Sequence, residues 1–356
     1  RIDYKGYSYS NISMDGAISD KVFSGILNIK DENLIFDFDG SIDFSTPKLQ
    51  KYDFTADLKK ANLRKINWSL RDSSTQVSGN LKVNMTGNRF EDLNGHLKLN
   101  NIVWKEKGKS FQVDSFNLNS AKSKNREMMV VKSDLMDAKI EGVYNLGEIY
   151  PTILNVLSKE IPSIKKVSVL KKIKGGNKFN IMIKLHDYSL INELFTPKIN
   201  LSKKTNLSGR FNDQKKIFSI NFASDSIFIN NRILHDVKLH SNNHGNQLNI
   251  SGGSKFIQVV NKLGIENILV NSTVKNNTLD YIVSYKNKSN KSSYGKISGV
   301  VNLSNLDSLK VNVLQSKFVH NDTLWQIDKS FSACIANKFI RIKDFNLHST
   351  NQFFKI

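Results

Sequence analysis

The sequence predicts an all-β protein built from one long, curled antiparallel sheet. Apolar and polar residues alternate with a period of two over most of the 356 residues, which is the pattern of strands with one dry face and one wet face. A five-residue figure, apolar-any-Gly-any-apolar, recurs along the whole chain, whereas a catalytic motif would occur once. Only 4 prolines are present, too few for the linkers that join strings of small domains.

The alternation is clearest in residues 34–44, LIFDFDGSIDF, where apolar residues and three aspartates fall on opposite faces. The joints between such segments are short and rich in Asn, Asp, Gly and Ser, which indicates hairpin turns. At about 13 residues per strand and turn the chain holds about 27 strands, and open sheets rarely exceed about 10 without curling or splitting. A series of sandwiches is the alternative, but the figure continues on both sides of a helical interruption. Further strands are predicted at 52–58, 66–70, 179–185, 218–222, 279–285 and 309–313.

The recurring figure places glycine on the apolar face of its strand. Glycine there removes a side chain and allows a strand to bend, so the sheet can curl into a trough with an apolar inner wall. Ordinary bulges in sandwich strands are the alternative interpretation. The figure occurs at 23–27, 38–42, 77–81, 93–97, 140–144, 207–211 and 297–301, and the sheet-curling glycines are predicted to be Gly40, Gly79, Gly95, Gly142, Gly209 and Gly299.

The same parity argument predicts which side chains line the trough. Large rings on this face could also fill a sandwich core, where aromatic residues are common. The predicted lining residues are Phe36, Phe38, Ile42, Phe44, Phe54, Leu58, Trp68, Val77, Leu81, Val83, Leu97, Leu99, Ile140, Tyr144, Ile181, Ile183, Leu207, Phe211, Ile220, Phe222, Ile297 and Val301.

Two segments break the alternation and predict amphipathic helices. Residues 147–162, GEIYPTILNVLSKEIP, give a helix at 148–161 with an apolar stripe of Ile149, Ile153, Leu154 and Leu157. Residues 187–197 give a second helix at 188–195, which we expect to begin after Asp187 and to stop at Pro197. These helices divide the chain into a β region at 1–146, a helical interruption at 147–197 and a second β region at 198–356. We hypothesise that one or both helices plug, gate or narrow the trough.

The net charge of +20 raises the question of nucleic-acid binding. The lysines are scattered over the polar positions of the strands, and no RNA-binding or helix-turn-helix signature is present. Dispersed solvating charge is therefore the favoured interpretation, an anionic surface such as lipid headgroups comes second, and nucleic acid is not an expected partner. The single cysteine, Cys334, cannot form an intramolecular disulfide, and no run of 18 apolar residues predicts a membrane-spanning helix.

Nothing in the sequence predicts an enzyme or a cofactor. The spacing of His235, His240 and His244 could suggest a metal site, but it crosses from a strand into a hydrophilic turn and lacks supporting ligands. Nucleophile-elbow, zinc-protease and phosphate-loop motifs are absent. We therefore expect neither catalytic residues nor a bound metal.

Six stretches follow one another along the chain: GSIDFSTP 40–47, YDFTADLKKANL 52–63, VVKSDLMDAKIEGVYNL 130–146 with the helix that follows, DYSLINELFTPKINL 187–201, NDTLWQI 321–327 and IKDFNLHSTNQF 342–353. In this order they resemble the TamB/AsmA-like family of cell-envelope proteins, in the form found in Bacteroidota-type bacteria.

The resemblance implies a long U-shaped β-groove in the periplasm whose apolar wall carries phospholipid acyl chains between the inner and outer membranes. It also implies that this chain is an excerpt, preceded by an inner-membrane helix and followed by a region that meets an outer-membrane barrel of the TamA/BamA type.

Two other functions stay open at this point. A chaperone-like scaffold for the assembly of outer-membrane β-barrel proteins would use exposed sheet edges for strand addition. A purely structural or adhesive β-array would have its apolar faces sealed by protein.

Overall fold

The computed structural model describes residues 1–356 apart from 48, 71, 90–91, 124–125, 165–175, 189, 191–198, 230–231, 244–245, 261–262, 288–291 and 337–338. Strands make up 69% of the structure and helical residues 5%, which confirms the all-β class. Strands β3–β27 belong to a long antiparallel sheet that is not closed into a barrel, as predicted. The described residues contain 27 strands, the number that the spacing of strands and turns predicts.

The chain divides into two compact units, Arg1–Gly142 and Val143–Ile356. The division falls four residues before the end of the predicted first β region at residue 146. The helical interruption and the later strands both belong to the second unit. The second predicted helix, at 188–195, lies almost entirely outside the described residues.

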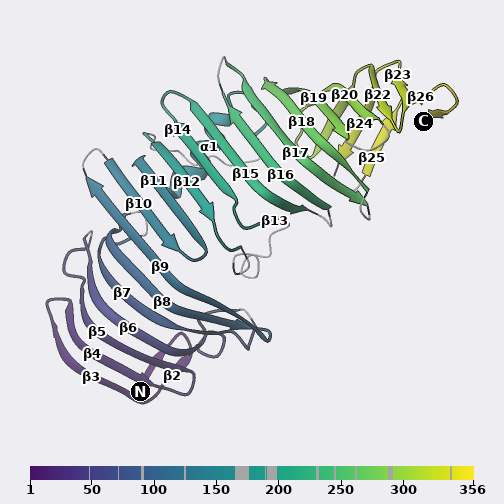
Figure 1. Cartoon of the computed structure of the whole chain (residues 1–356). Coiled ribbons are helices and arrows are strands. Elements are labelled where there is room, and N and C mark those ends of the chain that lie inside the picture. The colour runs from purple at the N-terminus through teal and green to yellow at the C-terminus, as the bar shows by residue number, and fades with distance from the viewer. Residues whose placement is uncertain are drawn as a thin grey trace. The chain divides into compact units, whose positions relative to one another are not determined.

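The first unit is a hairpin followed by a meander in which each strand pairs with the next (Figure 1). The hairpin is made by β1 (Ile2–Tyr4) and β2 (Tyr7–Tyr9), which pair only with each other among the described strands. The meander consists of β3 (Ile12–Ser19), β4 (Val22–Lys30), β5 (Leu34–Asp43), β6 (Lys51–Asn62), β7 (Gln76–Thr86), β8 (Asn94–Glu106), β9 (Lys109–Ser123), β10 (Arg126–Ser133) and β11 (Met136–Val143).

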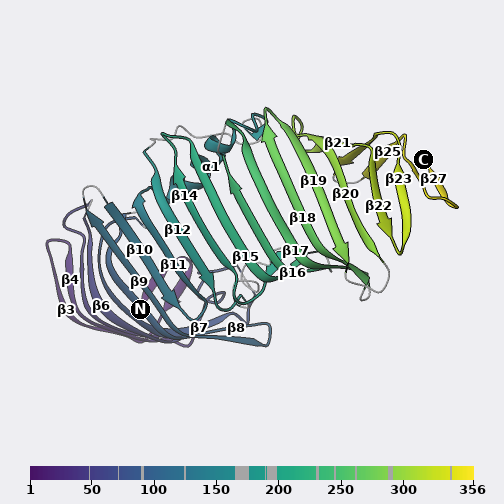
Figure 2. The same cartoon turned by 45° about the horizontal axis from the view of Figure 1, so that its top comes forward.

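The second unit opens with the 3-10 turn η2 (Leu146–Glu148) and helix α1 (Ile149–Leu157), which lies at one end of the strands (Figure 2). Its strands are β12 (Lys178–Leu185), β13 (Ile199–Leu201), β14 (Asn206–Asn212), β15 (Ile217–Ile229), β16 (Arg232–Asn242), β17 (Leu248–Val260), β18 (Leu263–Lys275), β19 (Thr278–Asn287), β20 (Ser293–Asn302), β21 (Ser308–Val313), β22 (Ser316–His320), β23 (Thr323–Ile327), β24 (Phe331–Ala336), β25 (Phe339–Lys343), β26 (Asn346–His348) and β27 (Phe353–Lys355).

The sheet of the second unit forks at β20. Residues 299–302 of β20 pair with β21, and residues 294–296 pair with β22. Beyond the fork, β21 pairs with β24, which in turn pairs with β25, while β22 pairs with β23. The two halves of one strand therefore start two separate branches.

The register of the strands gives each unit one apolar face and one polar face. Residues that are partners across neighbouring strands lie on the same face, so a chain of partners traces a row along the sheet. One such row in the first unit is apolar throughout: Met14, Leu27, Phe38, Ala56, Leu81, Leu99 and Phe116. The adjacent row on the other face is polar throughout: Ser13, Asn28, Asp37, Asp57, Asn80, Asn100 and Ser115.

Bulges bend the sheet along a line that crosses several strands. In the first unit, the register shifts at 35–36 in β5, at 58–61 in β6 and at 78–80 in β7, and Asn101 in β8 has a φ of 51°. In the second unit, Asp236 and Asn267 have φ values of 50° and 49° inside strands. Such bulges insert one residue and sharpen the local bend. The strands of the first unit are visibly curved along their length (Figure 1).

Each bulge also shifts the alternation by one residue. In β15 the apolar face carries Phe222 before the bulge, but an odd-numbered residue, Ile227, continues it beyond Asp225. Buried serines satisfy backbone carbonyls at this line, with Ser224 Oγ donating to the Ser226 carbonyl at 2.9 Å and Ser254 Oγ to the His235 carbonyl at 2.7 Å. These hydrogen bonds remove the penalty for backbone groups that the bulge leaves without strand partners.

The predicted strand at 66–70 is wrong, because this segment is a turn. Asn67 has a φ of 58°, and the Trp68 amide donates to the Leu63 carbonyl at 2.9 Å. The alternation of Ile66 and Trp68 has another cause. Ile66 is fully buried in a local apolar cluster, and the indole Nε1 of Trp68 donates to the Tyr9 hydroxyl at 2.9 Å.

Candidate functional site

The candidate site of the first unit is the apolar side of its meander, called here the first apolar face. Phe38, Val83 and Leu118 are at most 7% exposed, although they belong to a single sheet. A sheet with no second layer over it can bury side chains only by curling around them, so the first apolar face is the inner one. The predicted lining residues that the register places on this face are Phe36, Phe38, Ile42, Phe54, Leu58, Val77, Leu81, Val83, Leu97, Leu99 and Ile140.

Three predicted lining residues lie elsewhere. Trp68 is in the turn described above and is exposed, so its placement in a strand of the lining is wrong. Phe44 follows the end of β5, is exposed, and meets Tyr52 edge-on with ring centroids 6.3 Å apart. Tyr144 follows β11 and belongs to the second unit, where it is buried against Phe179.

Glycines let neighbouring strands come close together near the start of the first apolar face. Gly16, Gly25 and Gly40 are direct partners on three adjacent strands. A Cβ built on Gly40 would lie 2.3 Å from the Asp53 carbonyl oxygen and 2.5 Å from the Phe54 Cα. No side chain fits there without moving the backbone.

Positive φ values distinguish most of the predicted sheet-curling glycines. Gly40, Gly79, Gly95 and Gly142 have φ between 128° and 154°, a region that other residues rarely adopt. Gly209 and Gly299 are not among the glycines with positive φ. At Gly299 the reason for glycine is packing, since an added Cβ would lie 2.2 Å from the Asn312 carbonyl oxygen and 2.4 Å from the Tyr281 hydroxyl oxygen.

Aromatic rings cluster on the same face as the glycine row. The centroid of the Phe38 ring is 5.7 Å from that of Phe23 and 4.9 Å from that of Phe54. Phe38 is consequently buried, while Leu81 and Leu99 in the same row are only half-buried. The face is therefore filled by its own rings near β4–β6 and is more open across β7–β8.

A polar network fastens the β1–β2 hairpin at one end of the first apolar face. The Asp31 carboxylate accepts hydrogen bonds from the Tyr7 hydroxyl at 2.5 Å, from the Ser10 amide and hydroxyl, and from the Asn33 amide. Burial raises the pKa of Asp31, but these donors outweigh it and lower the pKa to about 2. Beside the network, Tyr9, Leu34, Ala61 and Ile66 form a buried cluster that covers this end of the face.

The second unit has its own apolar face, called here the second apolar face. One of its rows alternates large and small residues: Ile181, Gly209, Ile220, Ser241, Ile250, Ser272, Tyr281, Gly299 and Val313. Tyr281 was not predicted, and burial raises the pKa of its hydroxyl, as expected on an apolar surface. The predicted lining residues on this face are Ile181, Ile183, Leu207, Phe211, Ile220, Phe222, Ile297 and Val301.

Helix α1 is fixed at the strand ends by polar contacts. Its most buried residues are Thr152 and Val156, while the predicted stripe of Ile149, Ile153, Leu154 and Leu157 is half-buried. The Asn177 side chain donates to Thr152 Oγ1 at 3.2 Å. In the turn between β18 and β19, the Asn277 amide donates to the Glu160 carbonyl and its side chain accepts from the Ser163 amide at 3.0 Å. The helix therefore covers one end of several strands, which is compatible with a lid but does not test gating.

The described residues provide neither a metal site nor a membrane-spanning helix. They contain no group of three or more His, Cys, Asp or Glu that could hold a metal ion, and His244 lies outside them. Within the same residues, no helix has the length and apolar character needed to cross a membrane.

The comparisons with known proteins add no relative. No protein-family model matches the chain, and no curated protein or solved structure matches it significantly.

The sequence pattern alone did not reveal every residue of the first apolar face. Residues 111–118, FQVDSFNL, contain Phe111, Val113, Phe116 and Leu118, all on the first apolar face. Their spacing breaks between Val113 and Phe116, where the register skips Asp114 opposite the bulge at Asn101. Only the register with β8 recovers the common face.

Proposed function

We propose that this chain is part of a lipid conduit, in which phospholipid acyl chains lie along the apolar faces and move parallel to their rows. In the full protein the conduit would join the inner and outer membranes across the periplasm. A preceding segment would anchor it in the inner membrane, and a later region would dock on an outer-membrane barrel of the TamA/BamA type. These placements follow from the family resemblance.

The observation that carries the proposal is the direction of the apolar rows. The rows run from strand to strand, across the strands, so an apolar track follows the long axis of each sheet. A chain of about 16 carbons with half of its surface covered would gain on the order of 6 kcal/mol, at about 0.8 kcal/mol per fully buried CH₂. That gain holds a lipid on the track, while single steps along near-identical rows cost little.

The polar face of the first unit supports the proposal that lipid lies only on the apolar face. In the first unit, Lys59 bridges Asp37 at 2.7 Å and Asp57 at 3.9 Å on the side away from the rows. Charges on that side keep the outer face in water, and headgroups would remain at the open margins of the groove. No bond is made or broken in this function.

The experiment is site-specific photo-crosslinking in cells at two adjacent positions. Leu99 is half-buried on the first apolar face, and Lys98 is its exposed neighbour on the polar face. A conduit gives phospholipid adducts at 99 and none at 98. The same contrast is expected at Leu81 and Lys82.

Protein adducts at 99, with no lipid at either inner position, would reject the conduit and support a face sealed by protein. The scaffold alternative has one observation in its favour. Strand β3 pairs only with β4 among the described strands, and its Met14 and Ile18 are 56% and 70% exposed. Crosslinks from β3 to unfolded barrel polypeptides, without lipid at 99, would establish that function in place of the conduit.

A further inference from the structure

Almost all of the net charge belongs to the second unit. Residues 143–356 contain 30 Lys and Arg against 13 Asp and Glu, a net charge of +17. Residues 1–142 contain 22 against 19, a net charge of +3. The charge is therefore not spread evenly over the two units, and the second unit is the place to look for an anionic partner.

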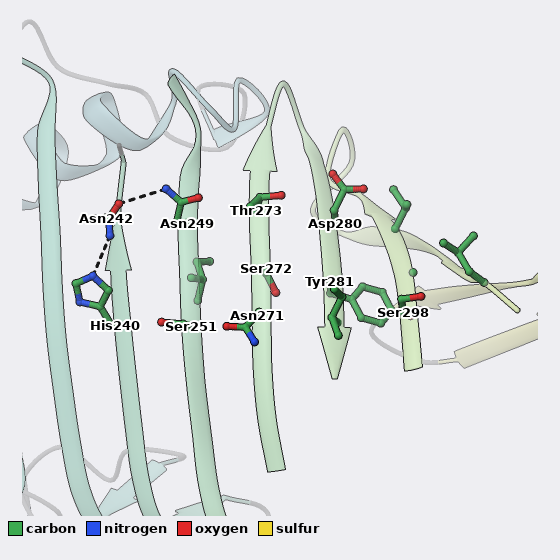
Figure 3. A pocket seen from close by; sticks show the side chains of 15 residues that line it. His240, Asn242, Asn249, Ser251, Asn271, Ser272, Thr273, Asp280, Tyr281 and Ser298 are labelled. Atoms are coloured by element: carbon green, nitrogen blue, oxygen red, sulfur yellow. Dashed lines mark hydrogen bonds between the residues drawn. The ribbon is translucent and has the colours of Figure 1, made fainter. Parts of the chain in front are cut away.

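A hollow of about 450 Å³ lies across β16–β20 (Figure 3). Most of its lining residues lie on the face opposite the second apolar face, while Ile250, Ser272, Tyr281 and Gly299 belong to the apolar row described above. Most of its polar side chains come from two neighbouring rows of partners. One row contains His240, Ser251, Asn271 and Ser298, and the other contains Asn242, Asn249, Thr273 and Asp280. Leu314, at the fork of the sheet, also lines the hollow.

One flank of the hollow is held rigid by hydrogen bonds. Asn242 Nδ2 lies 2.8 Å from His240 Nε2, and Asn249 Nδ2 donates to Asn242 Oδ1 at 3.3 Å (Figure 3). His240 Nδ1 lies 2.6 Å from Asn221 Oδ1. With the amide nitrogen of Asn242 donating to Nε2, Nδ1 is the ring nitrogen that donates to the Asn221 oxygen. The amides thus fix both the orientation and the tautomer of the histidine.

The rest of the hollow presents hydrogen-bonding groups that the protein does not use. In the described part of the chain, the side chains of Ser251, Asn271, Thr273 and Ser298 have no hydrogen-bond partner. Asp280 is the single carboxylate in the lining. A ligand with many hydroxyl groups could both donate to and accept from this set.

Four exposed lysines surround the hollow on the same face. Lys238 lies two residues before His240 on β16, Lys296 two before Ser298 on β20, and Lys275 two after Thr273 on β18. Lys310 is the register partner of Asn302 on β20, two residues beyond Val300 of the lining. Within the described residues none of the four forms an ion pair. With strands about 4.8 Å apart and same-face residues about 6.8 Å apart, they mark out an area roughly 20 Å across.

We propose that this hollow and its four lysines bind an acidic polysaccharide. Hydroxyl groups of successive sugar units would hydrogen-bond to Ser251 and Asn271 on β17 and β18 and to Ser298 on β20, and would donate to Asp280, since the row spans three strand spacings of about 4.8 Å. Carboxylates on neighbouring units would reach the lysines at the margin, away from Asp280. The ligand lies on the face opposite the lipid track, so this site is independent of the proposed conduit.

Other anionic partners fit the surface less well. A membrane surface is flat and would touch the lysines at the margin without filling the hollow between them. Single-stranded nucleic acid is held largely by bases stacked on aromatic side chains, whereas Tyr281 belongs to the row of the second apolar face and His240 is hydrogen-bonded through both ring nitrogens. A charged polymer with hydroxyl groups uses both the lysines and the free hydrogen-bonding groups.

The test measures binding of the chain to polygalacturonate, a linear polymer of uronic acid, with dextran as the neutral polymer of similar size. Lys238→Gln with Lys296→Gln should weaken binding at least ten-fold and lower the slope of log K against log salt. Asn271→Ala with Ser251→Ala should weaken binding about five-fold at an unchanged slope. Lys82→Gln with Lys98→Gln, which removes two exposed partner lysines on the polar face of the first unit, should change nothing.

Three outcomes would overturn the proposal. Polygalacturonate that fails to bind at low salt excludes the site. Equal or tighter binding of polyphosphate or oligothymidylate, with no effect of the Asn271 and Ser251 changes, indicates a non-specific charge effect. Binding only to vesicles that contain phosphatidylglycerol assigns the lysines to a membrane surface.

Discussion

Protonation of Asp31 should release the β1–β2 hairpin from the first unit. The carboxylate is 4% exposed and accepts four hydrogen bonds, two of them from Ser10 just after β2 and one from Tyr7 within it. Its pKa is about 2 in the folded chain, against an ordinary value of 3.8. At 1.36 kcal/mol per pKa unit this difference contributes about 2.5 kcal/mol. Since the folded pKa is the lower one, the contribution is complete above about pH 4 and is lost as pH falls toward 2.

The perturbation is Asp31→Asn, which keeps the shape of the side chain and removes the charge. Hydrogen exchange of residues 2–10, followed by mass spectrometry, measures the local opening free energy. At pH 7 the variant should exchange about 50- to 100-fold faster than the original chain, and this ratio should approach one as pH falls below 3. Asp72→Asn is the matched control, since Asp72 accepts only within its own turn, from Ser74. Equal exchange at pH 7, or a ratio that does not depend on pH, would refute the reasoning.

Three further changes test other parts of the structure. Gly40→Ala should lower the unfolding free energy of the first unit by about 3 kcal/mol in urea titrations, because its Cβ would lie 2.3 Å from a carbonyl oxygen at a φ of 143°. The control Gly108→Ala has open space around it and should lower the unfolding free energy by only about 1 kcal/mol. Equal losses for the two variants would show that the strands do not approach closely at Gly40. Leu99→Asp should reduce co-purified phospholipid at least ten-fold, since a carboxylate on the apolar face stays hydrated, while Lys98→Asp should leave the lipid content as it is. Asn277→Ala removes the acceptor for the Ser163 amide and should lower the local opening free energy of α1 by about 1 kcal/mol. This loss should appear as roughly five-fold faster hydrogen exchange in residues 149–164. An unchanged rate would mean that apolar contacts alone hold α1.

The sequence was sufficient for the fold class because a single sheet with one dry face leaves its period in almost every strand. Phe36, Phe38 and Ile42 could be assigned to one face from β5 alone, and the register agrees. Trp68 could not be placed, because a turn that buries Ile66 and pins the indole on Tyr9 produces the same spacing as a strand.

The hollow was invisible in the sequence for a different reason. Its polar residues are ordinary positions of five strands, and none forms a motif with its neighbours in the chain. Asn271 and Ser251 lie side by side only because β17 and β18 pair in one register. The concentration of charge in residues 143–356 could have been counted beforehand, but its meaning depends on which lysines share a face.

The two proposed ligands meet the same strands mainly through different side chains. In β17, the side chain of Ile250 lies on the second apolar face and that of Ser251 on the opposite face, because successive residues of a strand point to opposite sides, although both residues line the hollow. A substitution at one of them should therefore leave the other ligand's affinity unchanged unless the sheet itself moves. Bound lipid could change the affinity for the polysaccharide even though the side chains of the polar face stay the same. Such coupling would have to act by changing the bend of the sheet, along the line of bulges at Asp236 and Asn267. Measuring polygalacturonate affinity with and without bound phospholipid decides between two independent faces and one sheet that responds as a whole.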